Sequence, residues 1–218
     1  MIYLNERHQY IDDAEPDAQY IGVTGLIRQL GLRKSFAGVD EDTLKFAALR
    51  GEAVESILYA LIQGHEASVD VPAWERGGKT LRETVEARIP GIQNFLADHQ
   101  PEYVAHQMIV SDREALVAGT LDLVCEIKGE RWVLDCKATS KAEDDWIYQA
   151  SSYAGMLAMM KPESVVASVT EMRVGVLHFR PEWKSGYRVH EYADAPDKWE
   201  RLRAARITSL DAYRRVTA

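Results

Sequence analysis

The chain has 218 residues, with 26 Lys and Arg against 34 Asp and Glu, a formal net charge of −8 and 46% hydrophobic residues. This composition argues against disorder, collagen and coiled coil, and no apolar run approaches the roughly 18–20 residues that span a bilayer. The length suits one domain with a sizeable core, and the acidic balance counts at first against a nucleic-acid partner.

The N-terminal segment turns acidic at once and lacks the basic flank and apolar stretch of a signal peptide. The two cysteines, Cys125 and Cys136, are too few for a disulfide scaffold. We therefore expect a reducing, cytoplasmic setting without a membrane partner.

The first half of the chain is predicted to be mainly helical. Short strands with a turn fill about the first twenty residues, and Thr24 is the expected N-cap of a short helix. Asp40 opens a long amphipathic helix whose pattern Gly51 interrupts. A second helical stretch covers residues 79–98, with a break expected at Pro90.

The second half is richer in strand-forming residues. Runs of Val, Leu, Ile and Trp between turn residues predict an antiparallel meander, then a helix, two strands and a C-terminal helix. The expected ranges are 107–110, 116–127 and 131–137 for the meander, 144–160 for the helix, 171–179 and 186–191 for the strands, and 197–216 for the last helix. This order predicts a single α/β (α+β) domain with a mixed sheet of four to five strands between helices.

The last two strands of the meander carry the most informative residues. The turn between them predicts a hairpin centred after Gly129, which places Asp122 opposite Lys137. In the same register Asp135 lies opposite Val124. Because side chains alternate along a strand, both acids and the lysine share one face, where the carboxylates can converge. The other face is apolar: Leu121, Leu123, Cys125, Leu134 and Cys136.

Carboxylates gathered without His or Cys favour hard cations such as Mg²⁺ or Mn²⁺. A metal held by two Asp residues can polarise a phosphate oxygen and lower the pKa of a bound water. Lys137 could orient or deprotonate that water, or offset charge that develops on the phosphate. The set is typical of metal-assisted phosphodiester hydrolysis.

A structural ion pair is the alternative interpretation. An acid-x-Lys triplet is expected about once or twice by chance in a chain of this length, and Glu126-Ile-Lys128 is such a case at the hairpin turn. Asp135-Cys-Lys137 differs because an apolar strand leads into it, where isolated charges are costly. The triplet alone supports catalysis and a structural pair equally.

Three linked motifs, Gly119-Thr-Leu-Asp122, Asp135-Cys-Lys137 and Gln149-x-x-x-Tyr153, resemble in order and spacing the PD-(D/E)XK nuclease superfamily. The chain looks most like its RecB-like and phage-type (lambda-exonuclease-like) exonuclease branch. Further upstream, His8-x-Tyr10 with Gly22-Val-Thr24, and the Arg-Gly helix start within residues 47–55, are also similar to this branch. The resemblance covers roughly residues 8–160.

This resemblance implies a Mg²⁺-dependent DNA nuclease, in which Mn²⁺ can substitute, and most simply an exonuclease that processes DNA ends in recombination, repair or phage replication. Asp122 and Asp135 would bind the metal together with the backbone carbonyl of Cys136. Lys137 would be the catalytic lysine. Glu55 stands where RecB-like members have histidine, and other branches place a metal-binding glutamate on this helix.

The same resemblance implies that Gln149 and Tyr153 contact the substrate or order the site. They are one helical turn apart and so share a helix face. Arg50 could meet a phosphate, although the sequence favours the interpretation of a surface arginine. We expect no catalytic role for His106.

Two cysteines exclude the four-cysteine iron–sulfur cluster of several relatives, and the sequence has no phosphate-binding Gly-x-x-x-x-Gly-Lys loop for a nucleotide cofactor. The expected partner is DNA, with a recombination or single-strand-annealing protein or a helicase as further candidates and an oligomer left open. A single nuclease domain over residues 1–218 is expected, with parts 1–105, 106–160 and 161–218. An inactive or structure-specific DNA-binding module and a sequence-specific endonuclease are the alternatives. Because acids at a metal site lose their net negative charge to the bound cation, the overall charge of −8 does not exclude DNA.

Overall fold

The computed structural model of the chain describes residues 1–33, 38–160 and 172–217. Its helices are α1 (Val23–Gln29), α2 (Glu41–Ile62), α3 (Leu81–Glu86), α4 (Ile89–His99), α5 (Trp146–Met160) and α6 (Ala195–Thr217). Its strands are β1 (Ile2–Leu4), β2 (Tyr10–Asp12), β3 (Ile21–Gly22), β4 (Glu75–Arg76), β5 (Lys79–Thr80), β6 (Glu102–Asp112), β7 (Val117–Ile127), β8 (Glu130–Lys137), β9 (Arg173–Phe179) and β10 (Tyr187–Glu191).

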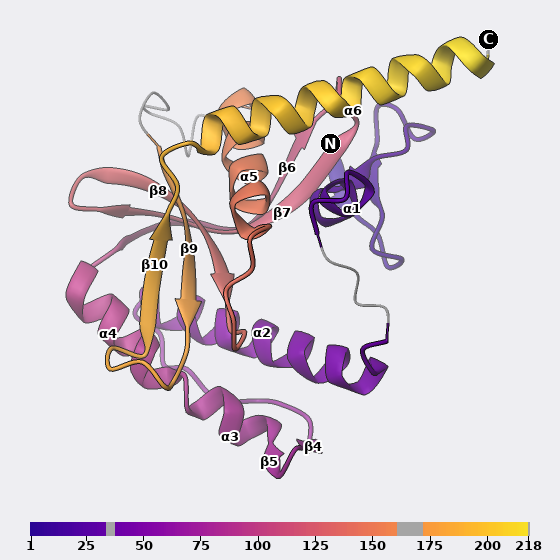
Figure 1. The fold of residues 1–218 in the computed structure, drawn as a ribbon. Helices are drawn as coiled ribbons and strands as arrows, with labels where there is room; N and C mark the ends of the chain where they lie inside the picture. Colours follow the sequence, from indigo (N-terminus) through magenta and orange to yellow (C-terminus); the bar gives the residue numbers. More distant parts are fainter. Residues whose placement is uncertain (34–37, 161–171, 218) are drawn as a thin grey trace.

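A mixed six-stranded sheet forms the centre of the described chain, in the order β10-β9-β8-β7-β3, with β6 along the other edge of β7. The β3–β7 and β8–β9 pairs are parallel, and the β6–β7, β7–β8 and β9–β10 pairs are antiparallel. Helices α5 and α6 lie on one side of this sheet and α2, α3 and α4 on the other (Figure 1). The predicted fold class, a mixed sheet between helices, is confirmed, as is the antiparallel meander.

Helix α2 begins where the sequence predicts. The Asp40 carboxylate accepts a hydrogen bond of 3.0 Å from the backbone N–H of Thr43, which caps the helix. The expected interruption at Gly51 is wrong, because the helix passes through it unbroken. A helical glycine costs only about 1 kcal/mol relative to alanine, and the buried apolar face of α2 outweighs that cost.

Helix starts elsewhere depend on local caps. The expected N-cap role of Thr24 is wrong, because Gly22 is the N-cap and Thr24 lies within the first turn of α1. Thr80 forms a capping box with Glu83 at the start of α3. The predicted break near Pro90 is confirmed: α3 and α4 are separate helices, and the proline lies in the first turn of α4, where its missing N–H costs little.

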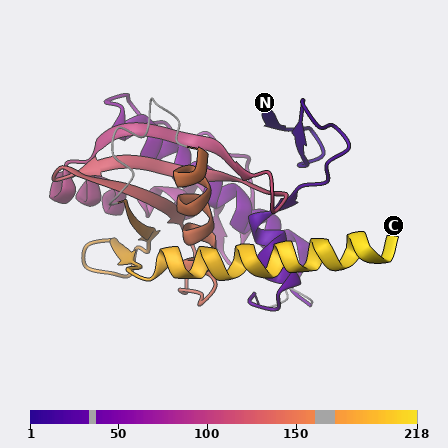
Figure 2. The same ribbon diagram turned by 90° about the horizontal axis from the view of Figure 1, so that it is seen from above.

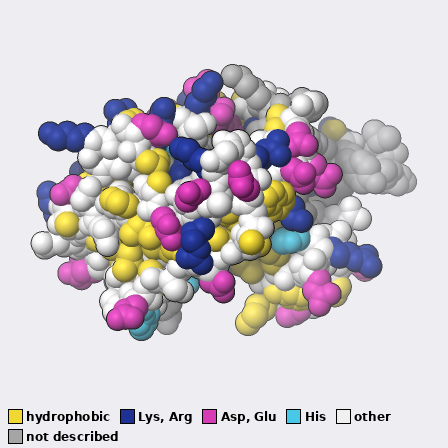
Figure 3. All heavy atoms as spheres, turned by 90° about the horizontal axis from the view of Figure 1, so that it is seen from below, with side chains coloured by type: hydrophobic (Ala, Val, Ile, Leu, Met, Phe, Trp, Pro, Cys, Tyr) yellow, Lys and Arg dark blue, Asp and Glu magenta, His cyan; other side chains and the backbone are white. Residues whose placement is uncertain are grey.

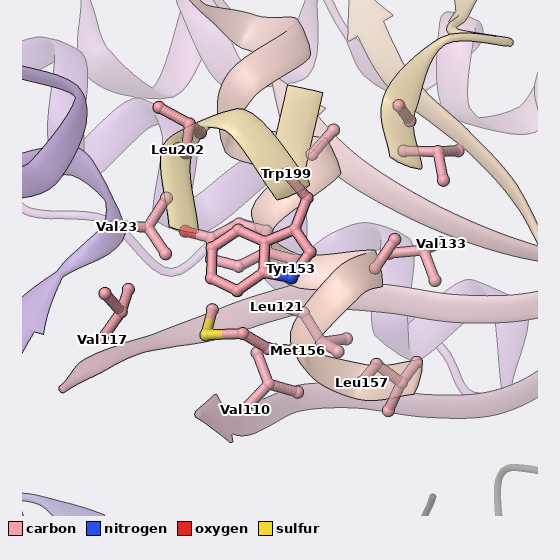
Figure 4. Packing of buried hydrophobic residues seen from close by; sticks show 14 of the residues in the cluster. Val23, Val110, Val117, Leu121, Val133, Tyr153, Met156, Leu157, Trp199 and Leu202 are labelled. Atoms are coloured by element: carbon pink, nitrogen blue, oxygen red, sulfur yellow. The ribbon is translucent and has the colours of Figure 1, made fainter. Parts of the chain in front are cut away.

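Two hydrophobic clusters fill the spaces between the sheet and its helices. The first joins β6–β9 to α1, α5 and α6, and Figure 4 shows Tyr153, Met156 and Leu157 beside strand residues of this cluster. The second joins β7–β10 to α2, α3 and α4. Trp199 and Leu202 of α6 are buried in the first cluster, so this helix packs on the body of its own chain. In Figures 1 and 2, α6 crosses α5 and runs on past α1.

Strand β6, at Glu102–Asp112, is longer than the expected range of 107–110 and begins five residues before it. The other second-half elements begin within two residues of their expected ranges. Strand β9 begins at Arg173, whereas residue 171, the predicted start, lies outside the described residues. None of the helices in the described residues is both long enough and apolar enough to cross a lipid bilayer.

Candidate functional site

The β7–β8 hairpin is two residues out of the predicted register. Ile127 pairs with Glu130, so Lys128 and Gly129 form the turn, both with positive φ of 53° and 78°. Such a two-residue turn matches the twist of the two strands. The expected pairs of Asp122 with Lys137 and of Asp135 with Val124 are therefore wrong.

Strand β7 has a gap along the edge that faces β8. Its residues 117 and 118 pair with β3, and its pairing with β8 begins only at Leu123. The segment between, residues 119–122, has no paired strand residue on that edge, although β6 continues along the other edge. The Gly-Thr-Leu-Asp motif occupies this gap.

The side-chain alternation of β7 also changes at the gap. Leu121 packs in the first hydrophobic cluster, whereas Leu123 and Cys125 pack in the second with Leu134 and Cys136. The predicted apolar face is thus confirmed for four of its five residues and wrong for Leu121. A strand that loses its neighbour can rotate locally, which a regular hairpin cannot do.

Asp122 bridges the gap with its side chain. Its Oδ2 accepts a hydrogen bond of 2.7 Å from the backbone N–H of Cys136. This carboxylate thus occupies the position of a ladder carbonyl just where β8 leaves β7. Because the N–H and C=O of one strand residue point to the same edge, the Cys136 carbonyl is directed to the same side as its N–H.

Asp135 and Lys137 form an ion pair between the Lys137 ammonium and Oδ2 of Asp135. Asp135 is completely buried, and neither of its carboxylate oxygens accepts a hydrogen bond from another group in the described residues. A buried carboxylate normally accepts two or more such bonds. Asp135 therefore has unused capacity to bind a cation or a donor.

Glu55 approaches the same region from α2. Its Oε2 accepts a hydrogen bond of 3.3 Å from the side-chain amide of Gln107, which also lies 3.2 Å from the hydroxyl of Tyr59. Gln107 has a φ of +48° within β6, an unusual conformation for a residue other than glycine. His106 stacks on the Tyr59 ring, with centroids 4.5 Å apart.

The carboxyl groups act on one another electrostatically. Burial, with the charge of Asp135, raises the pKa of Asp122 to about 7. Burial, with the charge of Asp122, raises the pKa of Glu55 to about 9. Burial also raises the pKa of Asp135, although Lys137 opposes that shift. For Lys137, burial lowers the pKa, but Asp135 and Asp122 outweigh it, so the pKa is raised overall.

Gln149 and Tyr153 interact directly. The Gln149 side-chain amide donates a hydrogen bond of 3.1 Å to the Tyr153 hydroxyl. The Tyr153 ring lies against Gly119, where a β-carbon would come within 2.5 Å of it. Only glycine fits here without displacing the ring, so the glycine of Gly119-Thr-Leu-Asp122 allows the tyrosine of Gln149-x-x-x-Tyr153 to pack against it.

A cavity of about 550 Å³ opens between α1, α2, the end of β8 and the start of α5. Glu55, Lys137, Gln149 and Arg50 all line it, as does Cys136. Asp122 adjoins the cavity through its hydrogen bond to the Cys136 amide, and Asp135 through its ion pair with Lys137. The structure thus brings the residues singled out in the sequence to one cavity and its wall.

The donor set fits a hard cation better than a soft one. In the described residues, no three His, Cys, Asp or Glu side chains are close enough together to form a complete metal site. Mg²⁺ needs only one or two carboxylates, because waters and substrate phosphates supply its remaining ligands. Asp135, with its unused oxygens, and the neighbouring Asp122 meet that requirement.

Two residues near the site carry no signal in the sequence. Gln107 lies in a strand without a motif, and only its left-handed backbone turns it toward Glu55. Arg88 is buried between α3 and α4 although its neighbours suggest a surface arginine. Neither residue could be selected from composition or spacing.

The fold is similar to a known structure. A protein from Eubacterium rectale named "Putative exonuclease" matches with a TM-score of 0.54 and 12% sequence identity, over 99% of this chain and 87% of that one. No family model matches the sequence, and no curated protein matches it. At this identity the similarity establishes the fold alone.

Proposed function

We propose that this protein is a Mg²⁺-dependent deoxyribonuclease, an exonuclease that processes DNA ends in recombination, repair or phage replication. The observation that carries the proposal is the buried Asp135 carboxylate, paired with Lys137 beside the cavity that Glu55 and Gln149 also line. The order of the motifs and the exonuclease name of the Eubacterium rectale protein support it. Recruitment by a recombination or single-strand-annealing protein or by a helicase belongs to the same proposal.

In this proposal Asp122 and Asp135 hold the metal with the backbone carbonyl of Cys136, and Glu55 completes the site through a metal-bound water. Mg²⁺ supplies, when bound, polarisation of a phosphate oxygen and a water of lowered pKa. Burial, followed by the charge of neighbouring carboxylates, raises the pKa of Asp122 and of Glu55, so their charged forms are costly. A bound divalent cation would stabilise those charged forms, and Mn²⁺ would do so as well.

Lys137 is proposed to offset negative charge on the phosphate. Its acidic neighbours raise its pKa, so the side chain is an ammonium at neutral pH. An ammonium that is already protonated cannot accept a proton, which disfavours a role as general base. On the substrate side, Gln149 and Arg50 line the cavity where a strand would lie, and Tyr153 holds Gln149.

Attraction of DNA is expected to depend on the cavity and its metal. In Figure 3, the described Lys and Arg side chains on the lower face lie among Asp and Glu side chains around a band of hydrophobic ones. Such a mixed face gives little long-range attraction for phosphates. DNA binding should therefore weaken when Mg²⁺ is removed and fall with salt.

End-labelled single-stranded and double-stranded oligonucleotides, incubated with Mg²⁺, test the proposal. Release of mononucleotides from one end supports an exonuclease, whereas internal cuts support the endonuclease alternative. Asp135→Ala and Lys137→Ala should abolish cleavage while the protein stays folded. Lys128→Ala is the matched control, because Glu126-Ile-Lys128 has the same spacing but its lysine is exposed at the hairpin turn. Wild-type turnover by either site variant would show that the assignment is wrong.

Calorimetry with Mg²⁺ and Mn²⁺ separates the enzyme from an inactive DNA-binding module. We expect the wild-type protein to bind both ions and Asp122→Asn to lose most of that binding. A protein that binds DNA but neither ion would favour the binding module.

A further inference from the structure

Two neighbouring arginines, the half-buried Arg50 and the buried Arg88, lie near the cavity, and neither is paired with a buried carboxylate in the described residues. Arg50 lies midway along α2 and lines the cavity, and Arg88 lies between α3 and α4 with only 8% of its surface exposed. The Nε atom of each is buried and has no hydrogen-bond partner in the described residues. Burial, together with the charge of Arg50, lowers the pKa of Arg88 to about 10.

Within the described part of the chain, neither guanidinium has a buried counter-ion. Arg88 donates one hydrogen bond, from Nη1 to the backbone carbonyl of Thr84. The carboxylate that acts on it is Glu182, which is 68% exposed and already paired with Arg180. For Arg50, burial lowers the pKa, and no acid among the described residues opposes that shift. Two desolvated cations with unused donors are costly unless an anion joins them.

Another arginine of the same cavity provides a contrast. Arg33 also lines the cavity, but its Nε lies 3.2 Å from the carboxylate of Asp145. Its charge is therefore compensated within the chain. Arg50 also lines the cavity but has no carboxylate partner among the residues that the structure describes. Its planar fork of donors suits the oxygens of a phosphate.

We propose that Arg50, with Arg88 behind it, forms a binding site for one phosphate of the nucleic-acid strand, separate from the phosphate that is hydrolysed. The Arg50 guanidinium contacts the phosphate. Arg88 is a positioning residue, whose positive charge next to Arg50 makes the site more attractive to an anion. Arg50 precedes Glu55 on α2 and shares its cavity, so the bound phosphate lies close to the carboxylates. The assignment to a DNA strand rests on the proposed function, whereas the anion site itself does not.

The anion site can be tested without metal or activity. Thermal unfolding is followed in EDTA with inorganic phosphate or with NaCl at equal ionic strength. Phosphate should raise the Tm of the wild-type protein by several degrees more than NaCl does, because it binds the folded state. Arg50→Met and Arg88→Met should lose that difference, and Arg82→Met should keep it. Arg82 is the control because it is half exposed and paired with Glu86.

Arg50→Met also distinguishes binding from structure. This side chain makes no hydrogen bond in the described residues through its buried Nε, so the variant should be at least as stable as the wild type in NaCl. A purely structural arginine would instead lower the Tm equally in both salts. No phosphate-specific shift in the wild-type protein, or an unchanged shift in both variants, overturns the proposal. If Arg88→Met does not fold, Arg50→Met alone decides.

A second measurement tests whether the phosphate belongs to DNA. Oligonucleotide binding is measured with Mg²⁺ in a Lys137→Ala background, where no strand is cut. Adding Arg50→Met should weaken binding equally for different sequences and lower its salt dependence by about one phosphate contact. If the phosphate-specific Tm shift is lost but DNA binding is unchanged, the site takes free phosphate and the strand assignment is overturned. If no cleavage is ever found, the Tm result still stands, so the two proposals fail separately.

Discussion

Replacing Gly119 with alanine tests the contact between the first and third motifs. A β-carbon at this position would lie 2.5 Å from Cε1 of Tyr153 and 3.0 Å from Cγ2 of Val23. Ordinary carbon contacts are about 3.5–4.0 Å, so the ring must move by about 1 Å within a buried cluster. Overpacking of this kind costs about 1–3 kcal/mol.

The expected fall in Tm follows from chain length. Unfolding entropy is about 2.1 cal/mol/K per residue, which for 218 residues converts about 1–3 kcal/mol into roughly 2–7 °C. Displacing the Tyr153 ring also moves the hydroxyl that Gln149 contacts, so cleavage should fall by more than the loss of folded protein explains.

Gly51→Ala is the matched control for the stability measurement. A β-carbon there meets nothing within 4 Å, and the residue lies inside α2. Alanine should therefore stabilise the helix by about 0.5–1 kcal/mol. Differential scanning calorimetry of both variants gives the comparison. A Gly119→Ala protein as stable as the wild type would refute the packing argument.

Three further outcomes are expected. In EDTA, raising the pH from about 5 to 9 should lower the Tm. The folded-state pKa values of Glu55, about 9, and of Asp122, about 7, exceed those of the unfolded chain, so the folded state holds more protons over this range and loses stability as the pH rises. Mg²⁺ should reduce that fall, and a Glu55→Gln protein with the same slope as the wild type would contradict the assignment. Tyr153→Phe should cost about 1 kcal/mol in urea unfolding, since it removes one hydrogen bond but keeps the ring; a loss as large as that of Tyr153→Ala, about 3–5 kcal/mol, would mean that the hydroxyl does more than accept one bond. Thr80→Ala should cost about 1 kcal/mol because it removes the capping box with Glu83, and an unchanged midpoint in the same assay would show that the cap is dispensable.

Local patterns predicted the elements well and their pairing less well. The ranges of α2, α5, β7 and β8 follow from apolar spacing, because burial on a helix or sheet face imposes that spacing. The hairpin register could not be predicted reliably, because Lys128 adopts a positive φ that sequence alone favours for glycine. The parallel pairs of β3 with β7 and of β8 with β9 join segments far apart in the chain, for which local pattern carries no signal.

The residues of the candidate site likewise fall into those that the sequence could predict and those that it could not. Asp122, Asp135, Lys137 and Gln149 were recognisable because their motifs are short and ordered. Arg88 was not, since its burial arises where α3 and α4 meet, and tertiary packing alone sets that position.

The gap along β7 has a consequence for the motions of the sheet. Residues 119–122 lack a backbone ladder on one edge, so side chains, among them the Asp122 carboxylate on the Cys136 amide, join the sheet there. Local opening should therefore begin at this point, and the Cys136 amide should exchange its hydrogen faster in Asp122→Ala than in the wild-type protein. Because metal or substrate would bind the same side chains, binding would then change the rate at which the sheet opens locally at residues 119–122.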